Sequence, residues 1–273
     1  MREVMFSALK EEAVSAIRHS YQVLTAEKDL SPGNERITHC LTRLVRTLTR
    51  CQSPELTKFL LNTPELAQER DRLPVLCGLA ECEMEKYWAR HLISRPVCDL
   101  AEFWYFPEYT ELCSAELDLF KTRHKFAQIS FLGSGALPLT AFLLARHCPD
   151  TKIVCVDMDD EACDLSEQLS RKIGLKGQVD VRRMDALTYA PVQNELVICA
   201  SLLQGREQVY RNLYNHDGAL IVRDSEGPYQ YLYKAAELPM PRFREVAKTT
   251  LNAKRINTSR YFERNTDMIA HAA

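Results

Sequence analysis

The chain has 273 residues, 46% of them hydrophobic, and its 35 basic and 37 acidic side chains leave a formal net charge of -2. This length and composition predict a folded globular protein of about two domains. The balanced charge gives no support to a nucleic acid or a membrane surface as a partner, and a small molecule fits better.

The N-terminal segment is amphipathic and charged, and the sequence has no 18-residue apolar run. Both features predict a cytoplasmic protein. The ten cysteines are scattered, without a Cys-x-x-Cys pair or a histidine at ligand spacing. We therefore expect reduced, mostly buried thiols and no metal site.

Residues 1–120 show apolar side chains at helical spacing, for example Leu41, Leu44, Val45 and Leu48, and almost no strand signal. Proline- and glycine-containing segments interrupt the pattern. This half is predicted to be a domain of four to six helices packed as a bundle.

Three glutamates lie close together in one of these helices. Glu81 and Glu85 are four residues apart and share a helix face, whereas Glu83 points to roughly the opposite side. A solvated acidic face paired with Lys86 and Arg90 is the plain interpretation.

Residues 103–109, Phe-Trp-Tyr-Phe-Pro-Glu-Tyr, form an aromatic cluster at the end of the helical half. Such clusters are most often core, but a buried tyrosine hydroxyl needs a partner. A glutamate together with Tyr109, facing a sulfonium compound, would suit proton abstraction from an amine.

From Phe126 on, short β-rich runs alternate with helices. The predicted strands cover 129–132, 153–156, 179–182, 196–200 and 219–223, and the runs 245–248 and 260–262 would add an antiparallel pair at one edge. Alternation of this kind predicts an α/β domain over 121–273, with a Rossmann-like parallel sheet of the class I methyltransferase type.

The first strand runs into a glycine turn and the second ends at an acid. Gly133 and Gly135 allow a sharp turn and close approach of a ligand, and Asp157 is placed to accept hydrogen bonds from a ribose diol. Pro138 stands in the predicted first helical turn, where a third glycine would serve a dinucleotide. S-adenosylmethionine is therefore favoured over NAD, and a tight turn without a ligand is the alternative.

Further candidates follow the other strands, because ligands bind at the carboxyl ends of such sheets. Asp185 suits either a helix cap or a contact to the adenine amino group. The predicted residues that bind S-adenosylmethionine are Gly133, Ser134, Gly135, Leu137, Pro138, Asp157, Met158, Asp185, Ala186 and Ala200.

Residues 131–140, Phe-Leu-Gly-Ser-Gly-Ala-Leu-Pro-Leu-Thr, resemble the Gly-x-Gly-Pro-Leu-Pro-Leu-Thr turn of the nicotianamine synthase family. The Leu-Pro-Leu-Thr part is the most specific. Other segments resemble family positions in the same order, so that the likeness runs from about residue 75 to 262; they are residues 83–86, 106–109, Arg223 with Gly227, and 257–259.

The resemblance implies a helical domain before a methyltransferase-like fold that does not transfer methyl. It implies transfer of the 3-amino-3-carboxypropyl (aminobutyrate) group of S-adenosylmethionine to an amine, with release of methylthioadenosine. Glu83 would match the glutamate that handles the proton of the attacking amine, and Tyr109 the tyrosine that orients it. Glu81, Arg223 and Tyr229 are the expected substrate-binding residues.

Three departures from the family bear on the acceptor. Plant members have tyrosine where this chain has Glu108, and family members tend to have arginine at the position of Tyr229. Loss of that guanidinium removes a carboxylate clamp. Because the chain is also shorter than the plant enzymes, the bacterial branch, which makes staphylopine- and pseudopaline-type opine metallophores, predicts a single transfer to the α-amine of histidine.

The same resemblance implies an opine dehydrogenase as the next enzyme in the pathway. The oligomeric state, a homodimer included, stays open. Two other functions stay open at this point. One is an ordinary small-molecule methyltransferase that uses S-adenosylmethionine, and the other is a non-catalytic binding or scaffold protein.

Overall fold

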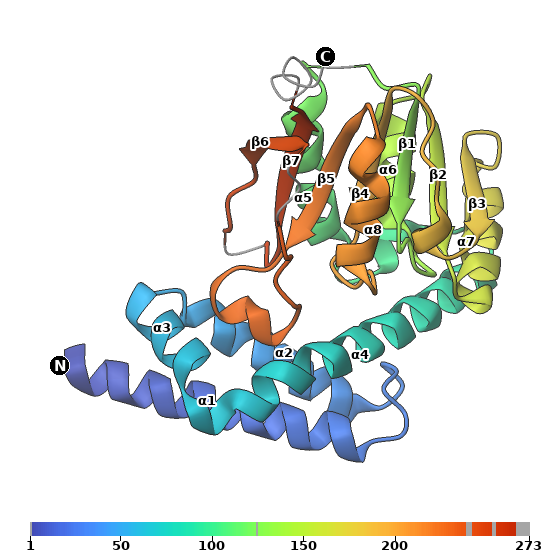
Figure 1. Cartoon of the computed structure of the whole chain (residues 1–273). Helices are drawn as coiled ribbons and strands as arrows, with labels where there is room; N and C mark the ends of the chain where they lie inside the picture. Colours follow the sequence, from blue (N-terminus) through green and yellow to red (C-terminus); the bar gives the residue numbers. More distant parts are fainter. Residues whose placement is uncertain (1, 124, 239–241, 253–254, 266–273) are drawn as a thin grey trace. The chain divides into compact units, whose positions relative to one another are not determined.

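A computed structural model describes residues 2–123, 125–238, 242–252 and 255–265 of the chain (Figure 1). Its contacts divide the chain into two compact units. The first holds the chain up to Tyr87 together with Ser225–Ala235, and the second holds Trp88–Asp224 and the chain from Ala236 on.

The first unit is helical. Asn34 and Ser53 cap α2 and α3 with side-chain oxygens that accept backbone N–H groups, and α1 packs on α2 through an apolar face that includes Leu44 and Leu48. The helices of this unit are α1 (Arg2–Ala26), α2 (Glu35–Arg50), α3 (Pro54–Asn62), η1 (Pro64–Leu66) and the part of α4 (Ala67–Ser94) up to Tyr87.

A segment from late in the chain completes this unit. The short helix η5 (Gly227–Tyr231) packs on α2 and α3. The Tyr231 hydroxyl donates to the Leu60 carbonyl at 2.7 Å, and the Tyr229 hydroxyl donates to Thr49 Oγ1 at 3.1 Å. Both tyrosine rings are therefore core of the helical unit.

The second unit is built on a seven-stranded sheet with the order β3-β2-β1-β4-β5-β7-β6. β1 to β5 are parallel, whereas β7 runs antiparallel to both β5 and β6. The strands are β1 (Gln128–Leu132), β2 (Lys152–Asp157), β3 (Val179–Arg183), β4 (Glu195–Cys199), β5 (Ala219–Asp224), β6 (Phe243–Lys248) and β7 (Thr258–Arg264).

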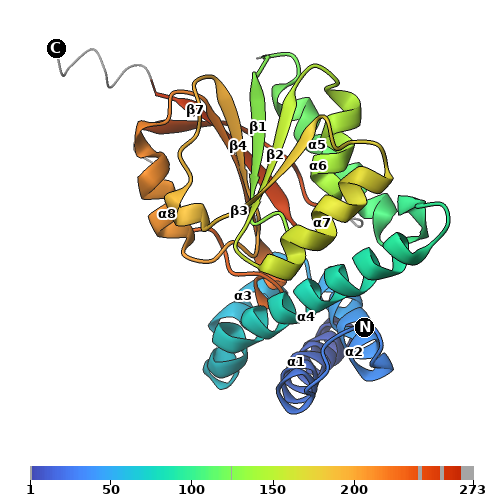
Figure 2. The ribbon, with the colours of Figure 1, turned by 90° about the vertical axis from the view of Figure 1, so that its right-hand side faces the viewer.

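Helices cover both faces of this sheet, with α5, α6 and α7 on one side and α8 on the other (Figure 2). Alternate residues such as Leu132, Val156 and Val222 join the core on the α8 side. The helices of this unit are the rest of α4, η2 (Leu100–Glu102), α5 (Phe106–Phe120), α6 (Leu139–His147), α7 (Asp160–Lys172), η3 (Ala186–Thr188), α8 (Arg206–Asn212) and η4 (Leu213–Asn215).

The expected fold class is confirmed, and all seven predicted strands are present in the described chain. Two details differ. The helix after the glycine turn begins at Leu139, so Pro138 occupies the position before its first turn. The compact units also differ from the expected division at residue 120, because α5 packs on α6 beside the sheet and residues 225–235 pack among helices.

All ten cysteines are free thiols, and most of them are buried. Within the described ranges, no helix is long and apolar enough to span a bilayer, and no three His, Cys, Asp or Glu side chains gather in a way that could hold a metal ion.

Candidate functional site

The glycine turn lies where the order of strands reverses, between β1 and β4. Gly133 and Gly135 have φ angles of 75° and 69°, in the left-handed region that favours glycine. A Cβ atom on Gly133 would lie 3.4 Å from the Ala200 Cβ. The turn therefore needs glycine for conformation and for its close approach to the residue that follows β4.

Asp157 holds this turn from the neighbouring strand. Its Oδ2 accepts the Gly135 N–H at 2.8 Å, and its Oδ1 accepts the Asp159 N–H at 3.0 Å. Each carboxylate oxygen can accept a further hydrogen bond. The acid thus organises the glycine turn and keeps capacity for two ligand hydroxyls, as a ribose diol requires.

The other predicted contact residues lie around the same end of the sheet. Asp185 Oδ1 accepts the Leu187 N–H at 2.9 Å and caps η3, which is the plainer of its two predicted roles. Met158, directly after Asp157, is 63% exposed and offers an apolar surface to an aromatic base. Ala186 and Ala200 are buried at the ends of β3 and β4, and Leu137 is buried beside the turn.

Arg223, at the end of β5, is fixed by a set of buried partners. Its Nε and Nη2 donate to the two carboxylate oxygens of Glu116 at 2.8 and 3.0 Å, and Nη2 also donates to Thr140 Oγ1 at 2.7 Å. The Ser259 hydroxyl donates to Glu116 at 2.6 Å. Burial by itself lowers the pKa of Arg223, but Glu116 outweighs it through its charge and hydrogen bonds, so that the guanidinium pKa is raised.

Sequence reasoning missed Glu116. It is fully buried on the face of α5 that also carries Leu112 and Cys113. A lone acid in an apolar helical stripe is the signal that could have found it, because such a residue is almost never buried without a partner.

Tyr109 lies in the first part of α5, within an aromatic group. Its ring centroid is 6.2 Å from that of Phe103 and 5.7 Å from that of Tyr105. The neighbouring Glu108 has a buried carboxylate oxygen, Oε2, for which the described residues provide no hydrogen bond. A carboxylate oxygen in that state is suited to an N–H donor from a ligand.

The remaining predicted residues belong to the helical unit. The Tyr233 hydroxyl donates to Glu81 at 2.8 Å, whereas Glu83 is 45% exposed and its carboxylate lies 4.0 Å from Lys86 Nζ. Tyr229 is 1% exposed and bonded to Thr49. A substrate contact for Glu81 or Tyr229, and catalysis by Glu83, stay predictions.

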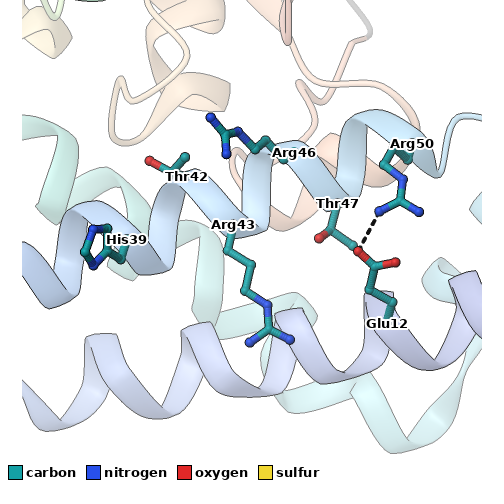
Figure 3. Close-up of a pocket in the computed structure, with 7 residues that line it drawn as sticks. All are labelled: Glu12, His39, Thr42, Arg43, Arg46, Thr47 and Arg50. Carbon is teal, nitrogen blue, oxygen red and sulfur yellow. Dashed lines mark hydrogen bonds and ion pairs between the residues drawn. The ribbon is translucent and has the colours of Figure 1, made fainter.

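The helical unit also has a polar hollow of about 320 Å³ along α1 and α2 (Figure 3). Arg43 and Arg50 point toward α1, where Arg50 pairs with Glu12 at 2.7 Å, and Arg46 points away from it. Its lining residues are Glu12, His39, Thr42, Arg43, Arg46, Thr47 and Arg50. No residue predicted to act in the site lies in this hollow.

The family model of the nicotianamine synthase protein matches residues 6–259. The chain belongs to the nicotianamine synthase family. Probable nicotianamine synthase 3 of Hordeum vulgare is 30% identical over 220 residues, which cover 75% of this chain and 64% of the relative. The chain thus spans just under two thirds of the length of the plant nicotianamine synthases that it matches first.

Solved structures of the nicotianamine synthase MtNAS have the same fold. A glutamate-to-glutamine mutant superposes with a TM-score of 0.82 at 19% identity, over 93% of this chain and 97% of that chain. The same mutant in complex with S-adenosylmethionine covers 92% and 97%, and MtNAS in complex with MTA and tNA covers 96% and 98%; both have a TM-score of 0.79 at 20% identity.

Proposed function

We propose that this chain transfers the aminobutyrate group of S-adenosylmethionine to the α-amine of an amino acid. The amine nitrogen attacks the carbon that joins the aminobutyrate group to sulfur, so an N–C bond forms as the C–S bond breaks. The sulfur keeps the electron pair and leaves in neutral methylthioadenosine, and the nitrogen loses one proton. Of the three carbons on the sulfonium, geometry selects the one that reacts.

The choice of S-adenosylmethionine as the donor rests on the glycine turn and on its hydrogen bond to Asp157. It provides bare backbone at Gly133 and Gly135, two carboxylate oxygens with remaining acceptor capacity, and the exposed apolar side chain of Met158. These features match an adenosine group with its ribose diol. The crystallised complex of MtNAS with S-adenosylmethionine supports the same donor.

Glu83 and Tyr109 are proposed to serve the acceptor. A carboxylate that accepts the proton as the amine attacks acts as a general base, and a hydroxyl that donates to the acceptor fixes its orientation. Glu83 suits the first role because it is partly exposed and only loosely paired with Lys86. Arg223 is proposed to bind the carboxylate of the acceptor, and Glu81 an ammonium group of the substrates.

We further propose that the acceptor is histidine, as in the bacterial opine-metallophore branch. Glu108 supports an acceptor with a second N–H donor, because its buried oxygen lacks a hydrogen bond among the described residues. An imidazole N–H would supply that bond. The product would then be a metal-binding opine precursor, and an opine dehydrogenase would act on it next.

Mass spectrometry of the products tests this proposal. Purified protein is incubated with S-adenosylmethionine and one amino acid at a time, and we expect release of methylthioadenosine with histidine only. Release of S-adenosylhomocysteine would instead establish a methyltransferase. A Glu108→Gln variant should release methylthioadenosine with alanine as well as with histidine; release with histidine only, as in the wild type, would remove Glu108 from acceptor recognition.

A further inference from the structure

Glu116 and Arg223 form a buried ion pair, with side chains 0% and 7% exposed. Every oxygen of Glu116 has a donor, since Arg223 binds both and Ser259 adds a third hydrogen bond. The pair joins α5 to β5 and β7.

Stability alone is a poor reason for such a pair. Removing two charges from water costs several kcal/mol per ion, and apolar residues of similar volume often replace a buried ion pair without loss of stability. A buried ion pair held in one geometry is better explained by the side chains that it positions. The neighbours of Arg223 indicate which side chains these are.

Arg223 is tied to the strand and helix that flank the glycine turn. Its guanidinium stacks on the Phe131 ring, with 4.8 Å to the ring centroid, and donates to Thr140. Phe131 lies two residues before Gly133, and Thr140 is the second residue of α6. The fixed guanidinium therefore belongs to the carboxyl end of the sheet, where ligands of this fold bind.

Tyr109 lies on the same helix as Glu116. It precedes Glu116 by seven residues on α5, which places both side chains on one face of that helix. After burial and Glu116, the charge of ionised Tyr109 is among the causes that act on the pKa of Arg223. Glu116 thus ties Arg223 to the helix that also carries Tyr109.

We propose that Glu116 is a positioning residue that fixes Arg223, and that the fixed guanidinium sets the place of the Tyr109 hydroxyl. The functional consequence rests on the proposed transfer reaction, in which Tyr109 orients the acceptor. If Glu116 is changed, Arg223 turns toward other acceptors and Tyr109 loses its fixed neighbour. The donor site at Asp157 keeps its own contacts.

The test compares Glu116→Gln with Glu195→Gln. Glu195 is the matched control, because it is also fully buried and holds a tyrosine, accepting from Tyr189 at 2.6 Å, but it lies at the opposite end of the sheet. We expect Glu116→Gln to lower kcat about 10- to 100-fold, since small misplacement of an orienting group has that effect. The Kd for S-adenosylmethionine should stay within about twofold, and Glu195→Gln should leave kcat unchanged.

A spectroscopic measurement follows the same variants without turnover. In protein labelled with carbon-13 at tyrosine Cζ, the Tyr109 signal is the one missing from Tyr109→Phe. We expect Glu116→Gln and the milder Glu116→Asp to shift that signal, and Glu195→Gln to leave it in place. Glu116→Asp guards against a Glu116→Gln variant that fails to fold.

An unmoved Tyr109 signal in the folded Glu116 variants would overturn the positioning role, as would a kcat equal to that of Glu195→Gln. Equal losses of kcat and donor affinity would also overturn it, because they indicate general disruption. If the wild-type protein transfers nothing from S-adenosylmethionine, the proposed function fails, and the Tyr109 signal alone then decides whether Glu116 positions that residue.

Discussion

The hydroxyl of Tyr233 donates to the carboxylate of Glu81 at 2.8 Å, inside the helical unit. Tyr233 follows η5 and belongs to the segment Ser225–Ala235, which comes directly after β5 in the chain and is part of the helical unit. One of the three clustered glutamates is thus engaged by a tyrosine. The Glu83 side chain, two residues further on, is 45% exposed, and its carboxylate lies 4.0 Å from Lys86 Nζ.

This difference leads to a prediction for the proton acceptor. Glu83→Gln keeps the shape of the side chain but cannot take up a proton, so kcat should fall about 100-fold or more while donor affinity is kept. Steady-state release of methylthioadenosine measures kcat, and calorimetry measures donor binding. Tyr233→Phe tests the Glu81 contact separately: loss of that hydrogen bond should raise the KM for a substrate whose ammonium group Glu81 binds and should change kcat little. If Glu81→Gln abolishes turnover and Glu83→Gln does not, the choice between the two glutamates is wrong.

Asp157 is expected to decide donor affinity. Asp157→Ala removes the ribose acceptor and the hydrogen bond that holds the Gly135 N–H, and each bond to a charged group contributes about 1.5 to 3 kcal/mol. The Kd for S-adenosylmethionine should therefore rise at least about tenfold. Asp159→Ala is the control, because Asp159 caps α7 and its loss should lower stability by about 1 kcal/mol without weakening donor binding. Equal binding by the two variants would argue against a ribose contact.

The sheet could be predicted closely from the sequence because its buried strands are short apolar runs bounded by turns. The run 129–132 became β1, Gln128–Leu132, and the acid after the second run stands at the end of β2. Local pattern sufficed for these elements, since both faces of a parallel strand are covered.

Contacts between distant parts of the chain could not be predicted in this way. No local signal tells that Glu116 pairs with Arg223, 107 residues later, or that Tyr229 reaches Thr49, 180 residues earlier. Pro138 shows the limit on a smaller scale, because proline is compatible with the first turn and with the residue before it. The site is therefore partly local, at the glycine turn, and partly a product of tertiary packing.

Tyr229 allows a direct choice between a structural and a substrate-binding role. Its hydroxyl donates to Thr49, which itself donates to the Val45 carbonyl at 2.8 Å. Tyr229→Phe leaves the ring in place and removes one hydrogen bond, so the free energy of unfolding should fall by about 1 kcal/mol. The KM for the acceptor should not change. A clear rise in that KM at unchanged stability would support substrate binding instead.

Three arginines on α2, Arg43, Arg46 and Arg50, should lower the free energy of unfolding through their like charges. Arg46 lies three residues after Arg43 and four before Arg50, so three like charges are neighbours on one helix. Arg46→Glu replaces a like charge by an opposite one, but because the side chain at this position points away from those of Arg43 and Arg50 (Figure 3), the free energy of unfolding should rise by no more than about 0.5 kcal/mol at low salt. Urea titrations at low and high salt measure the effect, which should shrink as salt screens it. A loss of stability would show that Arg46 serves an interaction within the fold.

His216 should make stability depend on pH. Its Nε2–H donates to the Glu195 carbonyl at 2.9 Å, its Nδ1 lies 3.9 Å from Asp217, and the charge of Arg264 acts on it as well. Burial is the main cause that lowers the pKa of the imidazole below its ordinary value of 6.5. Below pH 6.5 the unfolded chain therefore takes up a proton that the folded protein does not bind, and stability is lost as pH falls.

Urea unfolding of wild type and His216→Gln at about pH 7.5 and about pH 5.5 isolates this contribution, since the other histidines are common to both proteins. Glutamine can still donate to the Glu195 carbonyl but does not titrate. The wild type should lose more stability between the two pH values than His216→Gln does. The opposite order would mean that the folded protein binds the proton more tightly, and that Asp217 and the Glu195 carbonyl outweigh burial at this histidine.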